Sequence, residues 1–248
     1  MDAIILAAGY ATRLYPLTLN KAKPLLEVAG RPMIEWVLRS MAEVADLERI
    51  FVVTNDKFAK SFRDWAERYQ DRQLQPRLRI INDGSTSDAD KLGAIGDINF
   101  VITREGLAMR NLLVVAGDNL LDVSLAAFVD FAKKTPATVA VYDVGDLEQM
   151  KKYAAVSLDV DGTITHFEEK PQKPQSTLAA IGIYYYSGEV TSLITTYLAA
   201  GNNPDQPGRF VQWLYQRKPV KAYPLTGRWL DIGSKETLEH ADAIFRAM

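Results

Sequence analysis

Apolar and polar positions in the first half of the chain alternate between two kinds of segment. Uninterrupted apolar runs, which are typical of strands buried on both faces of a parallel sheet, occur at 3–8, 50–54, 78–81 and 112–116. Apolar residues at helical spacing occur between these runs, at 32–45, 58–69 and 91–104. Strands that alternate with helices predict a parallel, doubly wound sheet that binds its ligands at the carboxyl ends of its strands.

The pattern changes after about residue 138. Short strands with little helix between them are predicted at 138–143, 154–158, 163–168 and 180–186, and the Asp159–Gly162 segment is typical of a hairpin turn. A last helix begins near Ser234, with Thr237 in its first turn. We therefore expect an α/β fold with a Rossmann-like, doubly wound mixed sheet, parallel in its N-terminal half and with antiparallel additions in its C-terminal half. We expect one catalytic domain over residues 1–248.

Composition and charge exclude several classes of protein. The 248 residues contain no cysteine and two histidines, so disulfides, thiolate zinc sites, iron–sulfur clusters, cysteine nucleophiles and histidine-rich metal sites are excluded. Lys and Arg number 29 against 31 Asp and Glu, which gives a net charge of −2. This balance does not favour nucleic acid or an anionic membrane as a partner. No apolar run is long enough to span a bilayer and the start lacks a secretory signal, so we expect a cytoplasmic protein.

The first apolar run leads into a loop that suits phosphate binding. Small residues around Gly9 expose backbone N–H groups, and Arg13 adds a permanent cation. Lys23, held by the following proline, could reach the same anion. The loop matches neither the Walker motif nor the dinucleotide-binding glycine triplet, so a structural turn with solvated basic side chains is the alternative interpretation.

Isolated carboxylates follow other apolar segments. Asp118 closes the strand at 112–116, where it could hold a divalent cation or simply begin a turn. Asp231 lies between apolar residues near the end of the chain, and Glu169 and Lys170 end another predicted strand. Each of these signals is weak when taken singly.

Together the motifs resemble the sugar-1-phosphate nucleotidylyltransferases, especially the glucose-1-phosphate thymidylyl- and uridylyltransferases. The resemblance covers nearly the whole chain, in the order LAAGYATRLYPLT, KPLLEVAGRPMIEW, VVAGDN, FEEKP, IGIYYYS and GRWLDIG. It implies transfer of a nucleotidyl group to a sugar-1-phosphate, with release of pyrophosphate. It also implies Mg²⁺ as cofactor, a nucleoside triphosphate and a sugar-1-phosphate as partners, and self-association as a homo-oligomer.

The resemblance assigns roles by position. Arg13 and Lys23 are expected to neutralise the reacting phosphates, and Asp118 and Asp231 to hold Mg²⁺, so the catalytic set is Arg13, Lys23 and Asp118. The nucleotide-binding set implied by the motifs is Leu6, Ala8, Gly9, Asn82 and Gly93. The sugar-phosphate set is Tyr153, Glu169, Lys170 and Gly182. The left-handed β-helix that bifunctional relatives carry is not expected, because the chain stops soon after Asp231.

The sequence departs from the family pattern at positions that are expected to contact the substrates. Ala8 and Ala11 stand at positions where glycine is frequent, which costs little where the φ angle is negative. Ala154 replaces a usual glycine, and Ile181 a common threonine, which leaves the sugar open. The segment 82–93 lacks the usual Gln and Pro pattern, so the base is open as well, with dTTP or UTP and glucose-1-phosphate favoured.

Two other functions stay open. The first is cytidylyl transfer to phosphocholine or another alcohol phosphate, for which Tyr184, Tyr185 and Trp229 could contribute to an aromatic cage, although aromatic residues in a strand are more often core. The second is a non-catalytic, nucleotide-binding regulatory subunit. Retention of the charged residues Arg13, Lys23, Asp118, Lys170 and Asp231 argues against it.

Overall fold

The computed structural model describes residues 1–248 and contains eight α-helices and thirteen β-strands. The chain forms two compact units. The N-terminal unit comprises 3–91, 115–126 and 227–248, and the central unit comprises 1–2, 92–114 and 127–226. Each unit is described separately below.

Parallel strands form the centre of the N-terminal unit. Strand β4 (Arg49–Thr54) lies beside β1 (Asp2–Leu6) and pairs in parallel with β5 (Leu78–Asn82). Helix α1 (Met33–Met41) begins after Pro32. Helix α2 (Asp56–Arg68) is capped by Asn55, whose side chain accepts the N–H of Phe58. The aromatic face of α2 is buried, as its helical spacing predicts.

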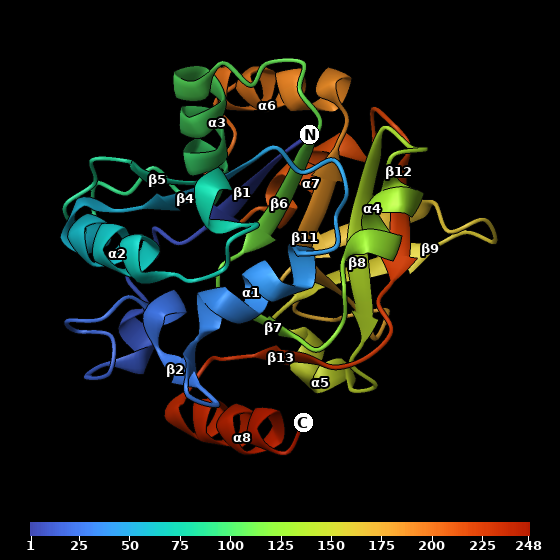
Figure 1. The fold of residues 1–248 in the computed structure, drawn as a ribbon. Coiled ribbons are helices and arrows are strands. Elements are labelled where there is room, and N and C mark those ends of the chain that lie inside the picture. Colours follow the sequence, from blue (N-terminus) through green and yellow to red (C-terminus); the bar gives the residue numbers. More distant parts are fainter. The chain divides into compact units, whose positions relative to one another are not determined.

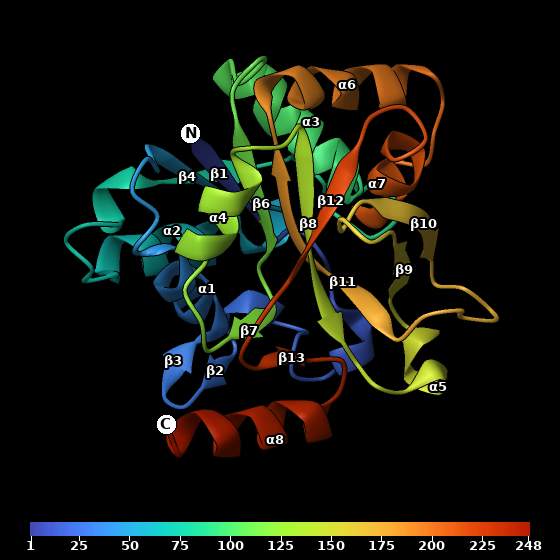
Figure 2. The ribbon, with the colours of Figure 1, turned by 90° about the vertical axis from the view of Figure 1, so that its right-hand side faces the viewer.

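Chain segments that are distant in sequence complete this unit. Strand β7 (Asn119–Leu121) pairs antiparallel with β13 (Trp229–Asp231), and β2 (Glu27–Val28) with β3 (Arg31–Pro32). Helix α8 (Lys235–Arg246) lies beside β2 in both ribbon views (Figures 1 and 2). Its apolar face covers a cluster that includes Val28, Trp36 and Phe245.

Mainly antiparallel strands form the central unit, as Figure 2 shows. The strand order is β10 (Ile164–Glu169), β9 (Ala154–Leu158), β11 (Leu178–Tyr186) and β6 (Leu112–Ala116). Strand β8 (Ala137–Asp143) pairs antiparallel with β11 and parallel with β12 (Val220–Pro224). The helices of this unit are α3 (Ala94–Glu105), which packs against α6 (Gly188–Ala199), and α4 (Ala126–Ala132), α5 (Leu147–Met150) and α7 (Gly208–Leu214).

The expected fold class is confirmed, since parallel strands come first and antiparallel strands follow. The hairpin turn at 159–162 and the last helix lie where the sequence predicts them, and Ser234 and Thr237 form a reciprocal capping box. Several boundaries differ by one or two residues, and the helix expected over 32–45 ends earlier, at Met41. The first strand ends at Leu6 because Ala7 and Ala8 enter the loop, and the helix expected from 91 begins at Ala94 because Gly93 takes a positive φ. No helix of the structure has the length and apolarity that crossing a bilayer requires.

Candidate functional site

The loop after β1 is fixed from several sides. The backbone N–H of Ala7 donates to the carbonyl of Val53 (2.9 Å), and the amide of Asn55 donates to the carbonyl of Ala8 (2.8 Å). Thr18, which is fully buried, donates its hydroxyl to the carbonyl of Ala11 (2.8 Å). The loop is therefore held in shape by hydrogen bonds to neighbouring elements and within itself, which is what a preformed anion cradle requires.

A hollow of about 170 Å³ opens beside this loop. Its lining brings together five residues that the sequence singled out: Leu6, Gly9, Arg13, Lys23 and Asp118. The ammonium of Lys23 lies 2.6 Å from Oδ2 of Asp118, and the Lys23 side chain is 11% exposed. A nearly buried cation is thus held at the carboxyl end of β6, next to the small residues of the loop.

Two small residues give this hollow its shape. A Cβ added to Gly117 would lie 2.8 Å from the carbonyl oxygen of Leu6, so only glycine lets the end of β6 reach this position. Ala11 has a φ of 47°. The mild cost expected for alanine at negative φ therefore does not apply to Ala11, which adopts the left-handed conformation that glycine favours.

Asp231 belongs to the same unit through a strand pair. In the register of β7 and β13, Asp231 lies opposite Asn119, the residue after Asp118. The indole N–H of Trp229 donates to Oδ1 of Asn119 (2.9 Å), which fixes this pair. The two isolated aspartates of the sequence therefore lie on neighbouring segments, although Asp231 does not line the hollow.

The segment after β5 is closed by its own polar groups. The amide of Asn82 donates to Asp56 (2.7 Å) and its oxygen accepts the N–H of Gly84 (2.9 Å), so this expected nucleotide contact is held by its neighbours. The carboxylate of Asp83 accepts both the N–H and the hydroxyl of Ser85. Tyr10 joins the segment to the first loop by donating its phenol to the carbonyl of Ser85 (3.2 Å), and burial raises the pKa of that phenol.

Gly93 lies in the central unit at the N-terminus of α3. Its φ is 78°, and an added Cβ would lie 2.8 Å from the backbone of Pro204. The N–H of Ile95 donates to the carbonyl of Pro204 (2.7 Å). Glycine at this position is required by the close approach of these two loops, whatever further role it has.

The expected sugar-phosphate residues gather at the end of β10. Glu169 pairs in register with Ala154, and the N–H of Lys170 donates to the carbonyl of Tyr153 (3.0 Å). Burial raises the pKa of the Glu169 carboxyl, although Lys170 and Arg209 lower it. The cluster therefore presents a partly desolvated acceptor with two cations close by.

Helix α7 adds two residues that the sequence did not single out. Oε2 of Glu169 lies so close to Gly208 that an added Cβ would be 2.1 Å from it, and the Phe167 ring would be 3.2 Å away. Arg209, the next residue, donates its Nε–H to Gln206 (2.9 Å). The first turn of α7 thus leaves room for the Glu169 carboxylate and adds a cation near it.

The last expected sugar contact, Gly182, lies at an irregularity of β11. The register with β8 shifts between Ala180 and Tyr184, and Gly182 has a φ of 71°. Tyr184 and Tyr185 are buried core residues, 3% and 1% exposed, as aromatic residues in a strand usually are. In contrast to these core tyrosines, Gly182 marks a bulge that shapes the strand locally.

Three features of the candidate sites could not be predicted from the sequence. The contacts of Tyr10 with Ser85 and of Gly208 with Glu169 join residues far apart in the chain, so no local sequence pattern indicates them. Arg209 follows a turn-rich segment at the start of a short amphipathic stretch, and this position was its only signal.

Known proteins resemble the chain over most of its length. Residues 2–246 match the model of a family described as nucleotidyl transferase. Among curated proteins, the chain is 28% identical to the bifunctional protein GlmU of Methanocaldococcus jannaschii over 94% of its own length and 51% of that protein. It is also 28% identical to a glucose-1-phosphate thymidylyltransferase of Neisseria meningitidis, over 97% of its own length and 81% of that protein. The chain thus spans about half the length of the first of these relatives.

Solved structures share the fold. A Bacillus anthracis protein assigned as a glucose-1-phosphate thymidylyltransferase, crystallised with sucrose, superposes with a TM-score of 0.86 at 23% identity, covering 100% of this chain and 96% of that one. A UDP-glucose pyrophosphorylase in complex with UDP-glucose gives a TM-score of 0.82 at 22% identity, covering 99% and 98%. At these identities the likeness is one of fold.

Proposed function

The chain belongs to the nucleotidyl transferase family, and we propose that it transfers a nucleotidyl group from a nucleoside triphosphate to a sugar-1-phosphate. The products are a nucleoside diphosphate sugar and pyrophosphate. The observation that carries the proposal is the hollow beside the first loop, where Arg13, Lys23 and Asp118 meet small residues at the end of a buried strand. The names of similar proteins, including glucose-1-phosphate thymidylyl- and adenylyltransferases, support the same reaction class.

The reaction needs positioning and charge neutralisation more than a protein nucleophile. An oxygen of the sugar phosphate attacks the α-phosphorus, a new P–O bond forms, and the bond to the bridging oxygen of the β-phosphate breaks. Pyrophosphate leaves with the bonding electron pair. Both reactants are anions and the attacking oxygen is already ionised, so no general base is required.

The residues of the hollow suit this task. Arg13 offers a planar fork that can hold two phosphate oxygens at once, whereas Lys23 acts as a point charge. Lys23 is held at 2.6 Å from Asp118, so its position is set before any phosphate arrives. We propose that Lys23 stabilises charge on the reacting phosphates and that Arg13 binds the leaving pyrophosphate.

Magnesium is the cofactor that this donor set fits. No group of three or more His, Cys, Asp or Glu residues could form a complete protein cage, and Mg²⁺ is usually held by one or two carboxylates together with phosphate oxygens and waters. Asp118 and Asp231, on neighbouring segments, would supply those two carboxylates. The bound ion would neutralise charge on the phosphates as it develops.

We assign the sugar phosphate to the cluster at the end of β10. Glu169 would accept hydrogen bonds from sugar hydroxyls, and its partial burial would strengthen them because water competes less. Lys170, with Arg209 nearby, would pair with the phosphate. Tyr153 and Gly182 complete the proposed contact set, and Leu6, Ala8, Gly9, Asn82 and Gly93 that of the nucleotide.

A substrate panel tests the activity. Purified protein with Mg²⁺ is incubated with dTTP, UTP, CTP or GTP and with glucose-1-phosphate, mannose-1-phosphate or phosphocholine, and pyrophosphate release is followed. We expect release with dTTP or UTP and a hexose-1-phosphate. Release only with CTP and phosphocholine would move the protein to alcohol-phosphate transfer, and no release in any combination would overturn the proposed activity.

One substitution tests the metal assignment. Asp118→Asn removes a carboxylate of the hollow while keeping its size, so Mg²⁺-dependent turnover should be lost while the protein still folds, with a lower unfolding temperature because Lys23 loses its partner. Asp130→Asn, on the exposed face of α4, is the matched control and should keep its activity. Near-normal turnover of Asp118→Asn would contradict the metal assignment.

A further inference from the structure

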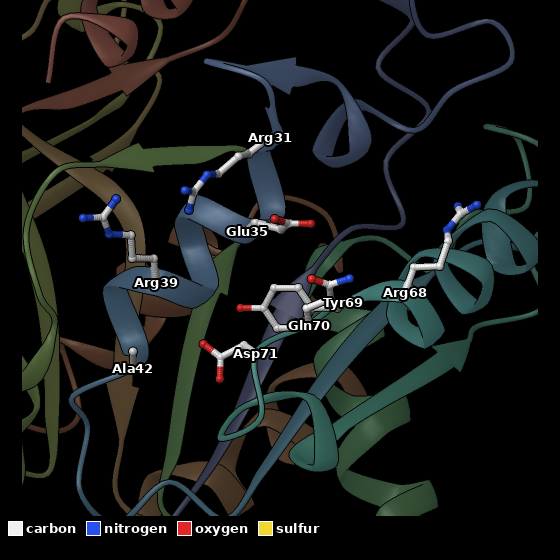
Figure 3. Close-up of a pocket in the computed structure, with 8 residues that line it drawn as sticks. All are labelled: Arg31, Glu35, Arg39, Ala42, Arg68, Tyr69, Gln70 and Asp71. Carbon is white, nitrogen blue, oxygen red and sulfur yellow. The ribbon is translucent and has the colours of Figure 1, made fainter.

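A second hollow of the N-terminal unit lies between α1 and the end of α2. It measures about 500 Å³, and its charged lining consists of three arginines and two acids, Arg31, Arg39, Arg68, Glu35 and Asp71. Figure 3 shows that the phenol of Tyr69 points between these groups, toward α1. None of these residues lines the hollow of Lys23 and Asp118, so the two are separate features.

The two acids of this hollow are engaged by neutral donors. Oε1 of Glu35 accepts the indole N–H of Trp65 (3.0 Å). Oδ1 of Asp71 accepts the backbone N–H groups of Gln73 and Leu74, both at 2.9 Å. Both carboxylates keep their negative charge, but these hydrogen bonds, rather than ion pairs with the arginines, fix their positions.

The three arginines of the hollow form no ion pair. No carboxylate lies within 4.0 Å of the guanidinium of Arg31, Arg39 or Arg68. Three positive charges against two negative ones leave the lining with a net positive charge. The hollow is therefore suited to an anion.

A fixed aromatic ring positions two of these guanidiniums. Those of Arg31 and Arg39 lie 5.6 and 5.4 Å from the centre of the Trp36 ring. Trp36 is 7% exposed, its indole N–H donates to the carbonyl of Val28 (3.0 Å), and its ring meets Phe245 edge-on. The ring is held in place, and its contact with both guanidiniums favours positions beside it, although both arginine side chains are exposed.

We infer that this hollow binds the phosphoryl group of a small phosphorylated molecule, with Arg31 and Arg39 as its ligands. Guanidinium forks suit phosphate because each can donate two parallel N–H bonds. Arg68 lies on the other side of Tyr69 in Figure 3 and adds charge at the rim. The inference is independent of the proposed function, since it involves none of the residues assigned to the reaction.

Arginine-specific modification tests it without an activity assay. The protein is treated with phenylglyoxal, with and without pyrophosphate and without Mg²⁺, and the modification rate of each arginine is measured by peptide mass spectrometry. Arg63 and Arg72, exposed on the same stretch of chain, are internal controls. At a pyrophosphate concentration of about ten times Kd, the rates of Arg31 and Arg39 should fall about tenfold, because the unliganded fraction falls as 1/(1 + [L]/Kd).

Two further arms make the result specific. In Arg13→Gln the protection of Arg31 and Arg39 should persist, which separates this hollow from the first one. Equal protection by sodium chloride at the same ionic strength would mean simple screening and would overturn the inference. Unchanged rates at Arg31 and Arg39 with millimolar pyrophosphate would overturn it as well.

Comparing ligands identifies the source of the phosphoryl group. Orthophosphate, pyrophosphate and a nucleoside diphosphate are compared in the same assay, and protection by any of them at Arg31 and Arg39 but not at Arg63 supports the inference. As a second measurement, Arg31→Gln/Arg39→Gln should lose one class of pyrophosphate sites in calorimetry, whereas Arg63→Gln/Arg72→Gln should keep every class. Retention of all classes by the first variant would contradict the assignment.

Discussion

The two clusters of charged residues assigned to the reaction balance their charge in different ways. In the N-terminal unit, Lys23 and Asp118 meet at 2.6 Å, so each neutralises the other directly. In the central unit, Glu169 is influenced by Lys170 and Arg209, yet burial dominates and raises the pKa of its carboxyl. The first cluster is a closed ion pair, which in the proposed function opens to bind phosphate. The second is a partly desolvated carboxylate that the absence of a side chain at Gly208 leaves room for.

The largest effect is expected where the pair is broken. Lys23→Ala removes the cation that we propose stabilises the reacting phosphates, and turnover should fall by about 10²–10³-fold, the usual loss when one preorganised donor is removed. Lys21→Ala is the matched control, because Lys21 is an exposed lysine of the same loop, 3.6 Å from Glu27. Pyrophosphate release measures both variants. Similar rates for the two would mean that Lys23 only neutralises Asp118.

The next effect is expected in the central unit. Gly208→Ala brings a methyl group into the space of the Glu169 carboxylate and should lower the free energy of unfolding by about 1–3 kcal/mol, the usual cost of overpacking. It should also raise KM for the sugar phosphate, because Glu169 must move. Chemical denaturation of Gly208→Ala and of Gly208→Ala/Glu169→Ala tests the cause. If the second change fails to offset the first, the strain lies elsewhere.

A smaller, pH-dependent effect distinguishes the buried acceptor from the paired site. The pKa of Glu169 is raised above its ordinary 4.5, so the folded state binds its proton more tightly than the unfolded state does. Stability from this group is complete below the unfolded pKa and is lost as the pH rises through the folded pKa. Glu169→Gln should therefore gain stability relative to the wild type as the pH rises above 4.5, as measured by denaturant titrations at several pH values. A constant difference across this range would contradict the raised pKa.

The smallest effect concerns the first loop. Ala11 has a positive φ, which costs about 1–2 kcal/mol in a residue with a Cβ, whereas glycine gains more freedom on unfolding. Ala11→Gly should therefore stabilise the protein by about 1 kcal/mol or less, measured as a shift of the denaturation midpoint. Ala8→Gly, in the same loop without a positive φ, should destabilise it.

The sequence predicts what depends on neighbouring residues. The last helix is marked by Ser234 and Thr237, three residues apart, and the first loop by a small-residue turn that follows an apolar run. The parallel strands are likewise marked by continuous apolar runs. These are short-range patterns, and the family resemblance added the order of the motifs.

Features that depend on contacts between distant segments could not be predicted from the sequence. Strand β12, with the sequence VKAYP, is short and mixed, and its parallel pairing with β8 fixes it as a strand. In the sequence Gly208 is only a small residue in a turn-rich stretch, because its close contact with Glu169 joins residues far apart in the chain. The arginine-lined hollow brings together the start of α1 and the end of α2, which are distant in sequence. Only the structure shows that Glu35 and Asp71 bond to other groups instead of pairing with the arginines.

The apolar cluster under α8 has a consequence for synthesis of the chain. Val28 and Trp36 are made early, whereas the residues that cover them, Ile232 and Phe245, follow roughly two hundred positions later. At about 5–20 residues per second, a ribosome needs about 10–40 s to supply that cover. During this interval the apolar residues of this cluster lack the cover that α8 provides, and they stay uncovered in any chain that stops before α8. Exposed apolar surface of this kind makes a partly synthesised chain prone to aggregation until α8 is added.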